Sequence, residues 1–148
     1  MFDILHRVGI KAAPGEVYGA LTMRDRLAGW WTSDTRGRTG AGGVIHFQFG
    51  ERGFIEMRVL ELAPGQRVVW EVTGGPADWI GTRVIWELAA EGAGTTLRFK
   101  HQGWREASDF MGHCSTKWGT FLLSLKSLLE SGRGAPFPND LLISIDWD

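Results

Sequence analysis

The sequence predicts an α+β fold in which an antiparallel sheet of about six strands packs against one long C-terminal helix. The helix is indicated by residues 108–131, where apolar side chains recur at helical spacing along one face. The strands are indicated between residues 43 and 104, where alternating apolar and polar residues are interrupted by glycine-rich turns. A chain of 148 residues fits one core, so we expect a single domain over residues 1–148, with its core in residues 1–138 and a tail in residues 139–148.

The first part of the chain predicts one strand and two short helices. Residues 2–11 alternate and end before a Pro-Gly pair, which is typical of a strand followed by a turn. Pro14 suits the first turn of a helix, and the apolar spacing with a break in the middle predicts two short helices that end at Trp31. Residues 33–43 are rich in Ser, Thr, Gly and charge and have no period, so we expect a loop there.

An antiparallel meander of five strands is expected next. Each strand carries apolar residues at every second position, as a half-buried sheet requires. Between two of the strands, Pro64-Gly65 suits the centre of a tight turn, because proline fixes the first dihedral and glycine permits a positive second one. The expected strands cover residues 44–49, 55–59, 68–72, 82–88 and 97–101.

The long helix is delimited by local signals. The side chain of Ser108 or Asp109 would accept hydrogen bonds from the first turn, and Gly132 would end the last turn. We expect a stiff elbow at residues 134–138, after which the apolar and acidic tail would pair with a sheet edge or with another subunit. The apolar face is expected to carry Phe110, Cys114, Trp118, Phe121, Leu122, Leu125, Leu128 and Leu129, and the polar face His113, Ser115, Thr116, Lys117, Ser124, Lys126 and Ser127.

The composition argues against several classes of partner. A net charge of -1 without basic runs argues against nucleic acid and against an anionic membrane surface. No apolar run reaches the roughly 20 residues that span a bilayer, and no N-terminal signal is evident. The single cysteine, Cys114, has no partner for an internal disulfide, so we expect a cytoplasmic protein.

Four motifs in a fixed order resemble a known superfamily. They are LAGWW at residues 27–31, EGAGTTL at 91–97, HQGW at 101–104, and the helical run 118–129 that leads to GAPFP at 134–138. Over about residues 5–138 the chain resembles the helix-grip fold of the START-like (SRPBCC) superfamily, which includes the birch-pollen-allergen and polyketide-cyclase families. Within it, the chain is similar to the family of the C-terminal domain of the heat-shock-protein-90 ATPase activator. The resemblance implies a sheet curled around the long helix, with a cavity between them that the small helices close.

Aromatic residues are unusually frequent, with eight Trp and eight Phe. So much aromatic surface in a small domain either fills the core completely or lines an apolar cavity, and the sequence leaves both interpretations open. If there is a cavity, we expect its ligand to be bound by residues at the inward positions of the facing elements. These are Trp31, Phe47, Phe49, Met57, Trp70, Trp86, Phe99, His101, Phe110, Cys114, Trp118 and Phe121.

No set of catalytic residues stands out. His101 and His113 are weak candidates for a general acid and base, because imidazole titrates near neutrality, but no carboxylate is spaced to orient either ring. Cys114 is expected to be a buried core residue rather than a nucleophile. The four His and one Cys show no metal-ligand spacing, so we expect neither a metal nor a cofactor. Arg83 is expected on the solvent face; a shift of one residue would instead turn it inward as an anchor for an anionic group.

The leading hypothesis is a small cytoplasmic protein that binds a hydrophobic or aromatic small molecule between sheet and helix, without chemistry of its own. Two alternatives stay open: a cyclase- or aromatase-like enzyme that uses His101 and His113, and a co-chaperone-like protein-interaction module. An exposed apolar patch around Leu141, Ile143 and Trp147 would favour that module or a homodimer through the tail.

Overall fold

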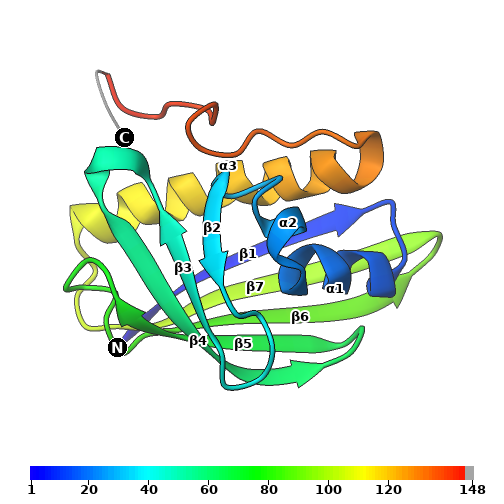
Figure 1. The fold of residues 1–148 in the computed structure, drawn as a ribbon, viewed down its shortest axis with the longest axis horizontal. Helices are drawn as coiled ribbons and strands as arrows, with labels where there is room; N and C mark the ends of the chain where they lie inside the picture. Colours follow the sequence, from blue (N-terminus) through cyan, green and yellow to red (C-terminus); the bar gives the residue numbers. More distant parts are fainter. Residues whose placement is uncertain (146–148) are drawn as a thin grey trace.

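The computed structural model describes residues 1–145 and shows one antiparallel sheet that curls around a long helix (Figure 1). The strands are β1 (Phe2–Ile10), β2 (Asp34–Gly37), β3 (Val44–Gln48), β4 (Phe54–Ala63), β5 (Arg67–Gly74), β6 (Arg83–Glu91) and β7 (Gly94–Trp104). The helices are α1 (Pro14–Thr22), α2 (Arg24–Leu27), the short 3-10 helix η1 (Gly50–Arg52) and α3 (Asp109–Ser131). The predicted α+β class, the two short helices and the long C-terminal helix are confirmed.

The strands lie in the order β1-β7-β6-β5-β4-β3-β2, so the chain forms a meander from β2 to β7 and β1 completes the sheet beside β7. The sheet therefore has seven strands, one more than the sequence predicts. Residues 33–43 were expected to form a loop, but β2 forms within them and pairs with β3, with Thr35 opposite Phe47. This edge strand has four residues, all of them polar or glycine, so it carries no apolar alternation that would indicate a strand.

The expected turn between β4 and β5 is present. Gly65 has a φ of 70°, a conformation that side chains with a Cβ rarely adopt. The backbone N–H of Gln66 donates to the carbonyl of Ala63 at 2.9 Å, which closes the turn. Proline followed by glycine at the two central positions therefore reverses the chain as the sequence predicts.

The inner face of the sheet carries a layer of large aromatic side chains. Across the strands, Trp70 lies opposite Val84, and Trp86 lies opposite Phe99. The Trp70 and Trp86 rings meet edge to face at a centroid distance of 5.5 Å, and both side chains are fully buried. Trp30, which follows α2, packs on Trp86 from the other side at 5.7 Å. This part of the core is therefore solid, filled by indole rings.

Helix α3 crosses the concave side of the sheet, and α1 and α2 cover the core near its C-terminal end (Figure 1). The hydroxyl of Ser108 accepts from the N–H of Met111 at 3.2 Å, and Gly132 ends the helix with a φ of 82°. Both predicted ends are thus confirmed. The predicted polar face is wrong at Ser124, which is buried, donates to the carbonyl of Trp30 at 2.8 Å and accepts from the N–H of Ala135 at 2.7 Å. His113 and Lys117, also predicted on that face, line a cavity beside the helix.

The segment after α3 turns back along the helix (Figure 1). Gly134 lies so close to the chain after α2 that a Cβ there would be 2.4 Å from the carbonyl oxygen of Gly29. Further on, Phe137 forms a parallel bridge with Thr32, and its N–H donates to the carbonyl of Trp31 at 2.8 Å. The C-terminal segment is therefore anchored beside β2 before the tail begins, and the described part of the tail, residues 139–145, forms no strand.

Among the described residues, no helix is long and apolar enough to cross a membrane.

Candidate functional site

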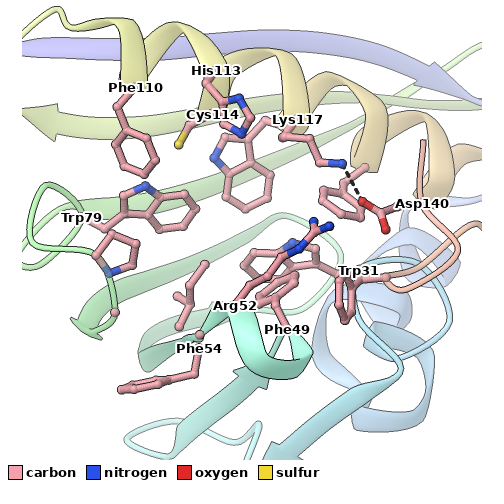
Figure 2. A pocket seen from close by; sticks show the side chains of 17 residues that line it. Trp31, Phe49, Arg52, Phe54, Trp79, Phe110, His113, Cys114, Lys117 and Asp140 are labelled. Carbon is pink, nitrogen blue, oxygen red and sulfur yellow. Dashed lines mark hydrogen bonds and ion pairs between the residues drawn. The ribbon is translucent and has the colours of Figure 1, made fainter. Parts of the chain in front are cut away.

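A cavity of about 480 Å³ lies between the first half of α3 and the curled edge of the sheet, at the end away from α1 and α2 (Figure 2). Five parts of the chain meet there: the segment between α2 and β2, the hairpin from β3 through η1 to β4, the connection from β5 to β6, α3, and the C-terminal segment. Its lining residues are Trp31, Phe49, Arg52, Gly53, Phe54, Ile55, Gly75, Pro76, Trp79, Phe110, His113, Cys114, Lys117, Trp118, Phe121, Phe137 and Asp140.

Aromatic rings make most of the wall. Trp31 and Trp118 meet at a centroid distance of 5.0 Å, and Trp79 stacks on Trp118 at 5.8 Å with an interplanar angle of 22°. Phe49 packs edge to face on Trp31 at 5.8 Å, and on Phe137 at 5.6 Å. Because each of these rings packs against its neighbours, the wall is rigid and presents flat apolar faces.

The polar side of the cavity contains an ion pair between α3 and the C-terminal segment. The ammonium of Lys117 donates to the carboxylate of Asp140 at 2.5 Å and to the carbonyl of Leu141 at 2.9 Å (Figure 2). The two charged side chains are only 14% and 5% exposed. The ammonium also lies 5.0 Å from the centre of the Phe121 ring. This cluster fixes the C-terminal segment against the rim of the cavity.

A second cation, Arg52, stands on η1 at the lip of the cavity. Its guanidinium lies over the Phe137 ring, 5.8 Å from the ring centre, and its side chain reaches into the cavity (Figure 2). Within residues 1–145 no carboxylate pairs with it. Arginine is always charged, so the guanidinium brings a positive charge to a mostly apolar wall.

His101 lies in the core rather than in the cavity. The indole N–H of Trp118 donates to its Nδ1 at 3.1 Å, so the ring proton is on Nε2. This Nε2 donates to the hydroxyl of Thr82 at 2.8 Å, and the hydroxyl donates to the carbonyl of Trp79 at 2.5 Å. Burial lowers the pKa of His101 to about 3, so the ring is neutral and both of its nitrogens are occupied.

His113 and Cys114 do line the cavity, and the Cys114 thiol is not activated for chemistry. The His113 ring is stacked with Phe110 at a centroid distance of 6.4 Å and does not share a site with His101. Burial raises the pKa of the Cys114 thiol to about 12, and the neighbouring Trp79 indole opposes this rise only in part. A thiol with so high a pKa is a poor nucleophile. The geometry therefore does not provide the acid and base pair that a cyclase using both histidines would need.

The structure separates the predicted ligand-binding residues into two sets. Those that line the cavity are Trp31, Phe49, Phe110, Cys114, Trp118 and Phe121. Those that are buried in the core, away from the cavity, are Phe47, Met57, Trp70, Trp86, Phe99 and His101. Arg83 is exposed opposite Glu71, so the alternative in which it turns inward is wrong.

Several lining residues were missed because they lie in connections rather than in periodic elements. Arg52 and Gly53 come from the turn between β3 and β4, Phe54 begins β4, and Trp79 comes from the connection before β6. Asp140 follows the elbow, and its position depends on the bridge that Phe137 makes. The only available signal was composition, because Trp in a connection is unusual unless the connection packs on something.

No group of three or more His, Cys, Asp or Glu side chains within residues 1–145 is arranged to hold a metal ion. The polar groups that line the cavity are few, and two of them, Lys117 and Asp140, pair with each other. The site can therefore enclose an apolar molecule and pair with a charged group at its rim.

The sheet that grips one long helix and leaves a cavity beside it defines a helix-grip domain of the START-like class. The family described as Activator of Hsp90 ATPase homolog 1-like protein matches residues 11–130. The chain belongs to this family.

Solved structures agree with this assignment. The chain is 45% identical to the protein in the solution structure of the Aha1 dimer from Colwellia psychrerythraea, with a TM-score of 0.84 over 90% of this chain and 100% of that chain. CalU16 from Micromonospora echinospora, at 22% identity, has a TM-score of 0.77 over 99% of this chain and 75% of that chain. MLL2253 from Mesorhizobium loti, at 20% identity, has a TM-score of 0.77 over 87% of this chain and 97% of that chain. The last two show the fold alone. None of the curated protein sequences matches the chain.

Proposed function

We propose that this protein binds a hydrophobic or aromatic small molecule in the cavity beside α3, and that it does so in the cytoplasm without chemistry of its own. The observation that carries the proposal is an aromatic-walled space of about 480 Å³ beside the buried indole rings of the core. Small-molecule pockets in proteins commonly have about 300–1,000 Å³ and a mostly apolar lining. The cavity fits that class in both size and lining.

The contrast between the two ends of the core supports this proposal. Around Trp70 and Trp86 the indole rings leave no space, whereas the Trp31, Trp79 and Trp118 rings stand around an opening. The last three rings are themselves buried, so the exposed apolar surface at the opening belongs to Phe54 and Phe110, at 41% and 37%. Exposed apolar surface often marks a place that a ligand or partner covers. A ligand that fills the opening would remove these ring faces from solvent.

The test is a screen for bound ligands with matched cavity variants. Fatty acids, flavonoids, polyketides and the uncharged probe N-phenyl-1-naphthylamine are titrated against the protein, with intrinsic Trp fluorescence and Tm as the readouts. In Cys114→Leu the larger side chain fills the cavity wall, so affinity is expected to fall at least about tenfold, as a lost contact of about 1.4 kcal/mol implies. Cys114→Ala removes the thiol without filling the space and is the control. If no compound shifts either readout in the unmodified protein, the proposal is wrong.

A second candidate function is assembly through the C-terminal segment, either as a homodimer or with a protein partner. The 45% identical relative was solved as a dimer, and Leu141, Leu142 and Ile145 are 67%, 56% and 98% exposed. Trp147, also expected in this patch, lies outside the described residues. The double variant Leu141→Ser with Leu142→Ser would convert a dimer to a monomer by light scattering after gel filtration. A monomer before substitution, together with no partner recovered by the unmodified protein, would exclude this second function.

A further inference from the structure

The charges at the rim of the cavity are not balanced. The charged or titratable groups that line it are Arg52, His113, Cys114, Lys117 and Asp140. Of these, Asp140 is the only carboxylate among the described lining residues, and it already accepts from Lys117. The guanidinium of Arg52 stands over an aromatic ring and pairs with no carboxylate within residues 1–145. An additional anion at the rim would therefore meet a cation that pairs with no carboxylate of the described residues.

The position of Arg52 makes this charge relevant to a ligand. Its guanidinium extends from η1 into the cavity, and the rings of Phe49 and Phe137 meet at the same lip (Figure 2). Arg52 is an exposed residue, so its guanidinium is accessible to an anion at the rim, and solvent limits the strength of that pairing. A guanidinium also offers two parallel N–H groups that match a carboxylate or a sulfonate.

A cationic ligand is disfavoured by the same arrangement. Its charge would face Arg52, while the carboxylate of Asp140 is already hydrogen-bonded to Lys117 and only 5% exposed. An uncharged ligand would fill the apolar part of the cavity but would leave the guanidinium without a partner.

We propose that the ligand of this cavity is an amphipathic anion, with an aromatic or other apolar body lying against the Trp31 and Trp118 rings and one anionic group paired with Arg52. This inference rests on the proposed function and narrows it to a ligand class. Arg52 acts as the specificity-determining residue, because it contacts the anionic group and not the apolar body.

The test compares two probes with the same ring skeleton. The anionic 8-anilinonaphthalene-1-sulfonate and the uncharged N-phenyl-1-naphthylamine differ by one sulfonate, and both fluoresce when they enter apolar surroundings. Dissociation constants are measured for the unmodified protein, Arg52→Gln and Arg52→Glu, with Arg58→Gln as the control. Arg58 is exposed on β4 and does not line the cavity, so this control changes the net charge equally without touching the site.

The inference predicts that Arg52→Gln weakens binding of the anionic probe about tenfold and that Arg52→Glu weakens it further, since a pairing of about 1.4 kcal/mol is lost and then reversed. Binding of the uncharged probe is expected to change less than about twofold, and Arg58→Gln is expected to change neither probe. Added salt should weaken the binding of the anionic probe and leave the binding of the uncharged probe unchanged.

The outcomes separate this inference from the proposed function. If Cys114→Leu abolishes binding of the uncharged probe while Arg52→Gln leaves the anionic probe unaffected, the cavity binds ligands but the inferred anion preference is wrong. Equal losses for the anionic probe in Arg52→Gln and Arg58→Gln would also overturn it, because they would reflect net charge alone. If neither probe binds to the unmodified protein, both proposals are wrong.

Discussion

The indole nitrogen of Trp118 donates a hydrogen bond across 3.1 Å to Nδ1 of His101, and this contact joins α3 to β7 in the interior of the domain. Trp118 presents its ring to the cavity and its N–H to the core, so one side chain belongs to both. The acceptor at the other end must be a neutral imidazole, because a protonated ring has no free lone pair at Nδ1. Protonation of His101 would therefore break the bond that positions a wall of the cavity.

This arrangement predicts that the protein loses stability as the pH falls below neutrality. The pKa of His101 is lowered from 6.5 to about 3 in the folded state, so below pH 6.5 the unfolded chain binds a proton that the folded chain does not. The stabilising contribution is therefore complete above pH 6.5 and decreases by about 1.4 kcal/mol per pH unit down to pH 3. Urea unfolding of the unmodified protein at pH 6.5 and 5.5 measures this loss directly.

His101→Gln is the matched variant, since it keeps an amide donor for Thr82 but does not titrate. It should be less stable than the unmodified protein at pH 7, by about 1–3 kcal/mol for a buried hydrogen bond left unmade. Its stability should also fall less between pH 6.5 and 5.5. His46 contributes with the opposite sign in both proteins, because hydrogen bonds to Gln48 and Glu56 raise its pKa. An equal fall in both proteins would refute the role given to His101.

A buried serine on α3 should matter more for stability than its residue type implies. The hydroxyl of Ser124 links the chain after α2 to the elbow after α3, through Trp30 and Ala135. Ser124→Ala would leave the buried carbonyl of Trp30 and the partly buried N–H of Ala135 without their partner, at a cost of about 1–3 kcal/mol in the free energy of unfolding. Thr116→Ala, on the exposed side of the same helix, should change stability by less than about 0.5 kcal/mol. Denaturant titration measures the free energy of unfolding of both variants. Equal losses of stability in Ser124→Ala and Thr116→Ala would contradict the role given to Ser124.

The ion pair at the rim should stabilise the protein, unlike an ion pair on the surface. Asp140→Asn removes the charge that faces Lys117 where both side chains are mostly buried, and it should lower the free energy of unfolding by about 1–3 kcal/mol. Asp34→Asn is the control: its pair with Arg36 is nearly as short, at 2.7 Å, but both side chains are about half exposed. It should have little effect on Tm, because solvent screens such pairs. Equal changes in Tm would argue against a structural role for the Lys117–Asp140 pair.

The cysteine should be almost unreactive in the folded protein. Burial raises the pKa of Cys114 from 9.0 to about 12, which lowers the thiolate fraction at pH 8 by about a thousandfold. Labelling with Ellman's reagent should therefore be slow in buffer and fast in urea. Equal rates in the two conditions would show that the thiol is accessible and not perturbed.

Most of the fold follows from local patterns in the sequence. The period of two between residues 43 and 104 and the long apolar stripe with its Ser108 cap predict the meander and α3. Ser124 was assigned by residue type to the polar face, although it lies three positions after Phe121 and four before Leu128, on the face toward the core. Position on the helix was the better signal there. β2 was missed because a short polar edge strand has no apolar period to detect.

The sequence predicted only half of the proposed ligand-binding residues correctly as lining the cavity, and the reason is geometric. Periodicity says which face a side chain occupies, but not where along a curled sheet the helix stands away from it. Phe47 and Phe49 were therefore treated alike, although Phe47 is fully buried in the core and Phe49 lines the opening. Arg52 and Asp140 come from segments whose position depends on contacts made after the elements have folded.

The most direct test of the account is NMR of the tryptophan side chains during a titration with N-phenyl-1-naphthylamine. The chain has eight Trp, and each indole N–H gives its own resonance, so the shifts report where in the protein the ligand binds. If the ligand enters the cavity, the largest shifts should occur at Trp31, Trp79 and Trp118, with smaller changes at Trp30, Trp70 and Trp86, which do not line it. A saturating ligand that leaves the first three unchanged would contradict the claim that this cavity is a binding site.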